Sequence, residues 1–224
     1  MSVATHLHNV LDPATLARAG QPDSLLSGFD LRHFDKGTLL STPGSARNQV
    51  FIVHSGRLRV YLAGANRELN VSFLETGDIY TTHTPMYVQT AAASALWMMD
   101  TRAFAHKLAN DPGINPMVMR VIGRLLSNAV TLIEDLAFRE VPARLARFLV
   151  GLAERRGRQD EHGCTIALDL STEDIAGLLG TTRQTVSLLM NQWQREGILQ
   201  RQGRHSLSIR SLERLAHYCL PPEC

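Results

Sequence analysis

The side chains best suited to recognition chemistry lie between Leu170 and Leu199. Arg183, Gln184 and Ser187 fall in the first turn or so of an expected helix. Arg can pair with guanine through two hydrogen bonds, and Gln can pair with adenine in the same way. A helix that presents such residues near its N-terminus is typical of a DNA-binding helix-turn-helix. We therefore expect these three residues to contact bases.

Local signals predict two short helices joined by a tight turn around these residues. Ser171 followed by Asp174 resembles a capping box, and Gly180 tolerates the positive φ that a sharp turn requires. Thr181 or Thr182 can cap the second helix. The apolar residues expected to face inward are Ile175, Ala176, Leu178, Leu179, Val186, Leu189, Met190 and Trp193.

A small hairpin, or wing, is expected after the second helix, from Ile198 to Ile209. Residues 183–214 contain six Arg and two Glu, an excess that suits contact with phosphates. We expect Thr182, Arg201 and Arg204 to contact the DNA backbone. The alternative is an ordinary helical hairpin with a solvated basic face.

Composition is that of a globular protein with one large domain or two smaller ones in 224 residues. The three cysteines, Cys164, Cys219 and Cys224, lack metal-ligand spacing and favour a reducing cytoplasmic setting. No apolar run predicts a membrane span, and no signal peptide is expected. The net charge of +2 says little, because residues 1–137 are balanced and residues 138–224 carry the positive excess.

Residues 29–100 change to short apolar runs separated by turn residues, which favours an antiparallel β-roll or jelly roll. The candidate strands are Gln49–Ser55, Arg57–Leu62, Glu68–Leu74, Val88–Ala92 and Ala95–Asp100.

A helix is expected over Asp100–Ala109, and a long one over Ile114–Phe138. A heptad pattern runs along the long helix and predicts a parallel dimer seam. The alternative is a helix packed on its own domain. The seam residues are Val118, Ile122, Leu125, Ala129, Leu132 and Leu136.

The expected fold class is therefore α+β, with three parts. Residues 1–113 would form a leader and a sensor roll, residues 114–138 a dimerisation helix, and residues 139–224 a winged helix-turn-helix. Pro142 begins a new helix that runs to Arg156, so a hinge is expected at residues 138–141.

This order of elements resembles the CRP/FNR family of bacterial transcription regulators, whose roll resembles a cyclic-nucleotide-binding domain. Residues 183–187 (RQTVS) are similar to that family's recognition helix. The resemblance implies a homodimer that binds a palindromic operator in double-stranded DNA and acts on RNA polymerase. It does not imply one effector, because members of the family sense different signals on one scaffold.

Two effectors fit the sequence poorly. Cyclic-nucleotide members hold the phosphate with an Arg-Ser pair late in the roll, whereas no Lys or Arg occurs here between Arg67 and Arg102. A buried phosphate without a cation would be poorly compensated, so cyclic AMP is not expected. Iron–sulfur members use a group of N-terminal cysteines, and none precedes Cys164, so no cluster is expected.

Heme fits better. Residues 56–62, 74–78, 133–136 and 201–204 resemble a heme-containing, carbon-monoxide-sensing member of the family, and His83 falls on its proximal heme ligand. The resemblance implies heme b, with carbon monoxide or nitric oxide as the gas. The amine of Ser2, freed by removal of Met1, would be the second axial ligand, although that member begins with proline. Thr81 replaces a Cys ligand, so thiolate ligation is not expected. The alternative is a surface histidine.

Gly123 in the middle of the long helix costs about 1 kcal/mol relative to Ala. Either a close helix–helix approach or space for a gas molecule, lined by Ile122 and Leu126, would explain it. Two other classes remain, a regulator of this fold with an organic ligand or none, and an enzyme. An enzyme is not expected, because no closely spaced His or Glu pair and no nucleophile–base motif accompanies His83.

Overall fold

The computed structural model describes residues 26–45, 48–65, 68–110, 115–160, 163–203 and 206–219. The predicted roles of the leader, Ser2 and Arg204 fall outside these residues. The chain forms two compact units, and the boundary between them falls inside helix α3 (Asn115–Phe138), after Ser127. Each unit is therefore described by itself.

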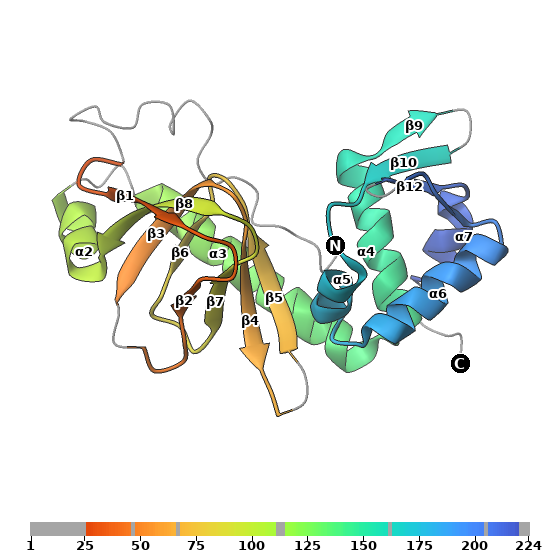
Figure 1. The fold of residues 1–224 in the computed structure, drawn as a ribbon, viewed down its shortest axis with the longest axis horizontal. Helices are drawn as coiled ribbons and strands as arrows, with labels where there is room; N and C mark the ends of the chain where they lie inside the picture. Colours follow the sequence, from red (N-terminus) through yellow and green to blue (C-terminus); the bar gives the residue numbers. More distant parts are fainter. Residues whose placement is uncertain are drawn as a thin grey trace. The chain divides into compact units, whose positions relative to one another are not determined.

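The first unit is the expected roll, built from two four-stranded sheets whose described pairings are antiparallel (Figure 1). Strands β3 and β5 have the predicted bounds, whereas β1, β2 and β6 were not predicted. In spatial order, one sheet consists of β1 (Asp30–Phe34), β8 (Ser94–Asp100), β3 (Gln49–Ser55) and β6 (Ile79–Thr81). The other consists of β2 (Leu39–Ser41), β7 (Tyr87–Thr90), β4 (Leu58–Ala63) and β5 (Glu68–Leu74).

Strand β3 is buried on both faces. Phe51 and Val53 belong to the cluster between the two sheets, whereas Val50 and Ile52 belong to a second cluster that includes Phe104 of helix α2 (Thr101–Asn110). Because consecutive side chains point to opposite faces of a strand, a continuous apolar run satisfies both clusters. The strand therefore joins the roll interior to the helix that covers its outside.

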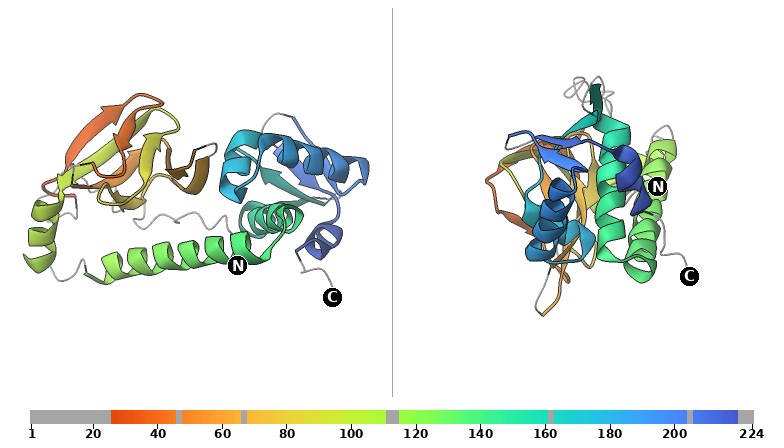
Figure 2. Two further views of the ribbon diagram at one scale, coloured as in Figure 1. Left: turned by 90° about the horizontal axis from the view of Figure 1, so that it is seen from below. Right: turned by 90° about the vertical axis from the view of Figure 1, so that its right-hand side faces the viewer.

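Helix α3 is continuous and long (Figure 2, left), but its exposed face differs from the predicted seam. Val118 and Leu125 pack against the roll, and Leu132 is buried. The apolar residues that the structure leaves exposed include Met119, Ile122, Leu126, Val130 and Ile133. Most of this exposed apolar stripe is thus offset by one residue from the predicted positions, because Val118, Leu125 and Leu132 pack within the chain, whereas the predicted Ile122 and Leu136 are exposed.

The second unit is the expected winged helix-turn-helix. Its core includes the fully buried Trp193, whose ring centroid lies 5.1 Å from that of Tyr218. Its helices are α4 (Val141–Arg156), α5 (Thr172–Leu179), α6 (Arg183–Arg195) and α7 (Leu212–His217). Its antiparallel sheet has the order β11 (Leu199–Arg201), β12 (Ser206–Ile209), β10 (Gly163–Ala167) and β9 (Arg158–Asp160).

The junction between α3 and α4 falls where a hinge was predicted, and an ion-pair cluster surrounds it. Asp135 is fully buried, and its Oδ1 lies 2.8 Å from Nε of Arg139 and 3.3 Å from Nε of Arg147. Arg139 also pairs with Glu134 at 2.7 Å. Burial raises the pKa of Asp135, although the two guanidinium groups oppose this. Among the described residues, no helix is long and apolar enough to cross a membrane.

Candidate nucleic-acid interface and sensor loop

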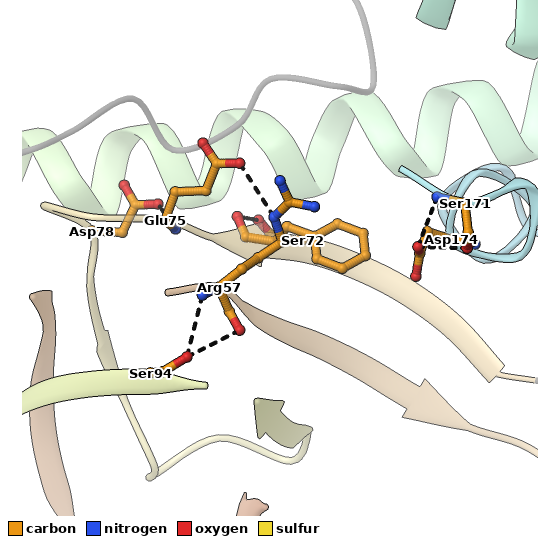
Figure 3. Close-up of polar contacts among 8 residues, drawn as sticks. Arg57, Ser72, Glu75, Asp78, Ser94, Ser171 and Asp174 are labelled. Atoms are coloured by element: carbon orange, nitrogen blue, oxygen red, sulfur yellow. Dashed lines mark hydrogen bonds and ion pairs between the residues drawn. The ribbon is translucent and has the colours of Figure 1, made fainter. Parts of the chain in front are cut away.

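The two helices that form the helix-turn-helix, α5 and α6 (together called the reader), begin and end with the predicted capping and turn residues. Ser171 Oγ accepts a hydrogen bond from the Asp174 backbone N–H at 3.1 Å, and the Ser171 N–H donates to the Asp174 carboxylate at 3.0 Å (Figure 3). Gly180 has φ +61°, as the tight turn requires. Thr182 caps α6 by accepting from the Thr185 N–H at 3.2 Å, so Thr182 rather than Thr181 is the cap.

Helix α6 has one buried and one exposed face. Its inward face is fixed by four buried side chains, those of Val186, Leu189, Met190 and Trp193. The opposite face opens onto a hollow on the protein surface, and the helix N-terminus adds partial positive charge there. The hollow is lined by Thr182, Arg183, Gln184, Ser187, Leu188, Asn191 and Arg195.

The structure thus brings together four predicted DNA contacts and adds three residues that sequence reasoning missed. The added residues are Leu188, Asn191 and Arg195. They follow Gln184 at helical spacing, by four, seven and eleven residues, so the pattern could have found them. Arg201 is exposed on the wing strand β11. The adjacent Gln200 is bonded by Arg210.

The histidine predicted to ligate heme iron lies in the loop between β6 and β7 and is exposed. Its ring Nδ1 lies 2.9 Å from Oδ1 of Asn48, and its backbone N–H donates to Thr81 Oγ1 at 3.2 Å. Because an amide oxygen can only accept, Nδ1 carries the proton. In the neutral imidazole with this tautomer, Nε2 of His83 keeps its lone pair. Sequence reasoning missed Asn48.

The loop is anchored on both sides of His83. Thr82 is buried, and its Oγ1 accepts from the Gln49 N–H at 2.9 Å, while Ser41 Oγ donates to the Thr82 carbonyl at 3.0 Å. On the other side, the Tyr80 hydroxyl lies 3.6 Å from Sδ of Met86. Met86 and Leu125 of α3 pack against the same core cluster. The loop that carries His83 is therefore held by contacts to the roll, and its Met86 packs against the same core cluster as Leu125 of α3.

Two of the cations in the roll are already engaged. Nε of Arg57 lies 3.5 Å from Oε1 of Glu75, and the Arg57 backbone N–H donates to Ser94 Oγ at 3.2 Å (Figure 3). The guanidinium of Arg59 lies 4.1 Å from the centre of the Tyr61 ring and donates to Gln89. Both groups thus neutralise or cover other side chains of the roll.

Gly123 lies on the exposed stripe of α3, with Ile122 and Leu126 beside it, 51% and 65% exposed. A Cβ added at Gly123 would meet no described atom within 4 Å. Close packing within the chain therefore does not explain the glycine, and the structure does not bring His83 against it.

Comparison with known proteins agrees with this architecture. A family model described as a Crp-like helix-turn-helix domain matches residues 143–218. A solved structure of a CooA variant from Carboxydothermus hydrogenoformans is 35% identical, covers 95% of this chain and 99% of its own, and superposes with a TM-score of 0.85. The reduced CO-sensing protein from R. rubrum is 32% identical over 93% of this chain and 98% of its own, with a TM-score of 0.53.

A curated relative is the CRP-like cAMP-activated global transcriptional regulator of Mycobacterium tuberculosis. It is 28% identical, and the alignment covers 82% of this chain and 85% of the relative. CRP-family regulators are dimeric, and they are transcription regulators rather than enzymes, which agrees with the expectation from sequence. With the roll, the long helix and the winged helix-turn-helix in place, the chain belongs to the CRP/FNR family of DNA-binding transcription regulators.

Proposed function

We propose that this regulator is a homodimeric, heme-based sensor of carbon monoxide or nitric oxide. The observation that carries the proposal is the hydrogen bond between His83 and Asn48, 2.9 Å long. Histidines that ligate metals commonly donate their second ring N–H to an oxygen, which fixes the tautomer and the orientation of the ring. His83 already has this arrangement, with Nε2 left available to iron.

The residues fit the group in two further ways. The exposed ring of His83 is held by a loop whose flanking residues are anchored in the roll. Ile122, Gly123 and Leu126 offer an exposed apolar surface on α3, which His83 of the same chain does not contact at Gly123. When bound, heme supplies an iron atom at which a small diatomic gas can coordinate. The likeness to a solved protein described as the CO-dependent transcription factor CooA, 36% identical with a TM-score of 0.53, supports this choice of effector.

Cyclic AMP is the effector of the curated mycobacterial relative and must be weighed against heme. A bound phosphate needs a cation or several amide donors. The sequence has no Lys or Arg between Arg67 and Arg102, and the Arg57 and Arg59 side chains contact Glu75 and Tyr61. The second candidate is therefore a regulator of this fold that binds a non-heme small molecule, or none, rather than a cyclic-nucleotide receptor.

Dimerisation would use the exposed apolar stripe of α3. Met119, Leu126, Val130 and Ile133 follow one another at steps of seven, four and three residues and are all more than half exposed. A second copy of the helix would remove this surface from water and pair two recognition helices. A two-fold pair of readers suits a palindromic operator with half-sites about one DNA turn apart, where the dimer would act on RNA polymerase.

Helix α3 would also couple the sensor to the reader. Leu125 packs on the core that supports the His83 loop, and Leu136, near the other end, lies 2.8 Å from where a Cβ of Gly180 would be. The Asp135 cluster fixes the join to α4. A change in the preferred position of α3 would thus bias the turn of the reader, with a coupling typically worth about 1–3 kcal/mol.

The test is an absorption spectrum of the full-length protein titrated with hemin, reduced with dithionite and then exposed to carbon monoxide. We expect a saturable Soret band that shifts with the gas, and its loss or displacement in His83→Ala. His54→Ala is the matched control, because His54 is also exposed on the roll but contacts only the Trp97 ring among the aromatic neighbours described. Absence of saturable hemin binding, or equal spectra for wild type and His83→Ala, would refute the proposal.

A further inference from the structure

We infer that Leu188 reads a thymine in each half-site of the operator, through the 5-methyl group of the base. The inference rests on the assignment of α6 as the base-reading helix. It adds an apolar element of specificity to the polar contacts expected from Arg183 and Gln184. It does not depend on which effector controls the protein.

The position of Leu188 carries the argument. Its side chain is 63% exposed, although it belongs to a helix whose inward face is already complete. It lines the same hollow as Arg183, Gln184 and Asn191, one helical turn after Gln184. A side chain in this hollow that enters the major groove with its neighbours must meet a base edge or a sugar-phosphate chain.

Single exposed leucines are common on protein surfaces and need no function by themselves. Leu188 differs because every other residue lining the hollow can form hydrogen bonds. Leu188 has a large apolar side chain with no polar atom that could form a hydrogen bond with water or with a phosphate. In the groove it would displace water without replacing the hydrogen bonds of a polar base edge.

The chemistry of the major groove then selects the base. Thymine alone among the four bases presents a methyl group there, whereas cytosine and adenine present amino donors and guanine presents two acceptors. Contact with Leu188 would remove the methyl group from water and would leave polar groups of the other bases unsatisfied. The favoured base at this position is therefore thymine.

The test uses the full-length protein and duplexes selected by it from a randomised pool. Selection is run in parallel on hemin-loaded, reduced protein under carbon monoxide and on protein without hemin, so that the effector does not limit the experiment. In the selected duplex, each thymine pair related by the two-fold axis is replaced by deoxyuridine, which lacks only the methyl group. Affinities are measured by fluorescence anisotropy for wild type and for Leu188→Ala.

We expect one pair of thymines whose replacement weakens wild-type binding about fourfold per half-site, the factor for one methyl group leaving an apolar contact. Leu188→Ala should bind the thymine and deoxyuridine duplexes equally well, whereas Leu188→Met should keep the difference. Leu62→Ala, which truncates an exposed leucine on β4, should behave as wild type.

The outcomes distinguish the role of Leu188 from the base-reading role of α6. Sequence-selective binding in which no thymine loses its methyl effect in Leu188→Ala would overturn the inference and leave the reader assignment standing. Failure to select any sequence under either condition would overturn the base-reading assignment of α6, and the inference with it. Circular dichroism of Leu188→Ala should match wild type, because the side chain is exposed.

Discussion

At the scale of single residues, the pair formed by His83 and Asn48 has the most direct consequence. Asn48 stands next to β3, 35 residues before His83, and accepts the ring N–H. Loss of such an oriented partner commonly lowers metal affinity 10- to 100-fold. We expect Asn48→Ala to weaken hemin binding by about this factor in a titration followed at the Soret band.

Asn48→Asp is the matched variant for this prediction. It keeps an oxygen that can accept from Nδ1 and should retain hemin affinity within a few-fold of wild type. Asn48 is exposed, so neither change should unfold the roll. Equal hemin affinity for Asn48→Ala and wild type would show that the hydrogen bond has no part in ligation.

Gln184 provides a second prediction at this scale. It is exposed in the hollow of α6, and its amide can pair with adenine through two hydrogen bonds. Gln184→Ala should relax preference at one position per half-site, by about 1–3 kcal/mol between the best and worst base. Gel shifts with singly substituted operators measure this. Uniform weakening on all operators would instead assign Gln184 to the backbone.

The residues that were predicted correctly are those whose role is local. Ser171, Gly180 and Thr182 act within a few positions of themselves, through caps and a positive φ, and these signals are present in the sequence. The pairing of His83 with Asn48 depends instead on how β3 and β6 lie side by side, with Val50 opposite Thr81. No periodicity or spacing encodes such a contact, which is why Asn48 was missed.

At the scale of elements, helix α3 shows what a pattern leaves undecided. Two apolar stripes run along it, one residue apart. Val118, Leu125 and Leu132 were predicted to form the dimer seam, yet the structure uses them within the chain. A heptad repeat predicts that a stripe of residues is buried, but which part of the protein or partner covers it depends on tertiary packing. The bounds of the helix, by contrast, were predicted within one residue.

The junction of α3 and α4 carries the prediction that belongs to this scale. Asp135 is fully buried between Arg139 and Arg147, whose side chains are 18% and 16% exposed. Removing the carboxylate leaves two partly buried guanidinium groups without it, which costs about 3–5 kcal/mol in such pairs. We expect Asp135→Ala to destabilise the second unit by this order, measured by urea unfolding.

The chain has two tryptophans, so a Trp97→Phe background lets Trp193 fluorescence report the second unit alone. Glu134→Ala is the matched control, because its carboxylate also pairs with Arg139 but is 48% exposed. Its effect should stay below about 1 kcal/mol. Equal destabilisation by the two variants would mean that the burial of Asp135 has no energetic consequence.

At the scale of the whole molecule, the exposed stripe of α3 predicts where a dimer can be broken. Ile133 is 64% exposed, so Ile133→Glu should fold normally but place a charge against its counterpart in the partner copy. Sedimentation equilibrium should show a monomer at concentrations where wild type is dimeric. Ala105→Glu, which adds the same charge to an exposed position of α2, should remain dimeric. A dimeric Ile133→Glu would place the interface elsewhere.

If the protein binds DNA as a dimer, the dependence of its DNA affinity on salt can also be predicted. The excess of positive charge is concentrated in residues 138–224, which contain the reader. Affinity for DNA should therefore fall steeply with salt, because salt weakens the contacts between Arg side chains and phosphates. Arg201 is exposed on β11 and is expected to make one such contact per protomer. Each lost contact makes the negative slope of log affinity against log salt shallower by about 0.9, so Arg201→Gln should make the slope of a dimer shallower by about 2. Arg32→Gln on β1 removes a charge from the roll that is also exposed, although it pairs with Asp30, and should leave the slope unchanged. A slope that becomes shallower by only about 1 would mean that only one wing of the dimer touches the duplex. An unchanged slope would mean that Arg201 contacts no phosphate.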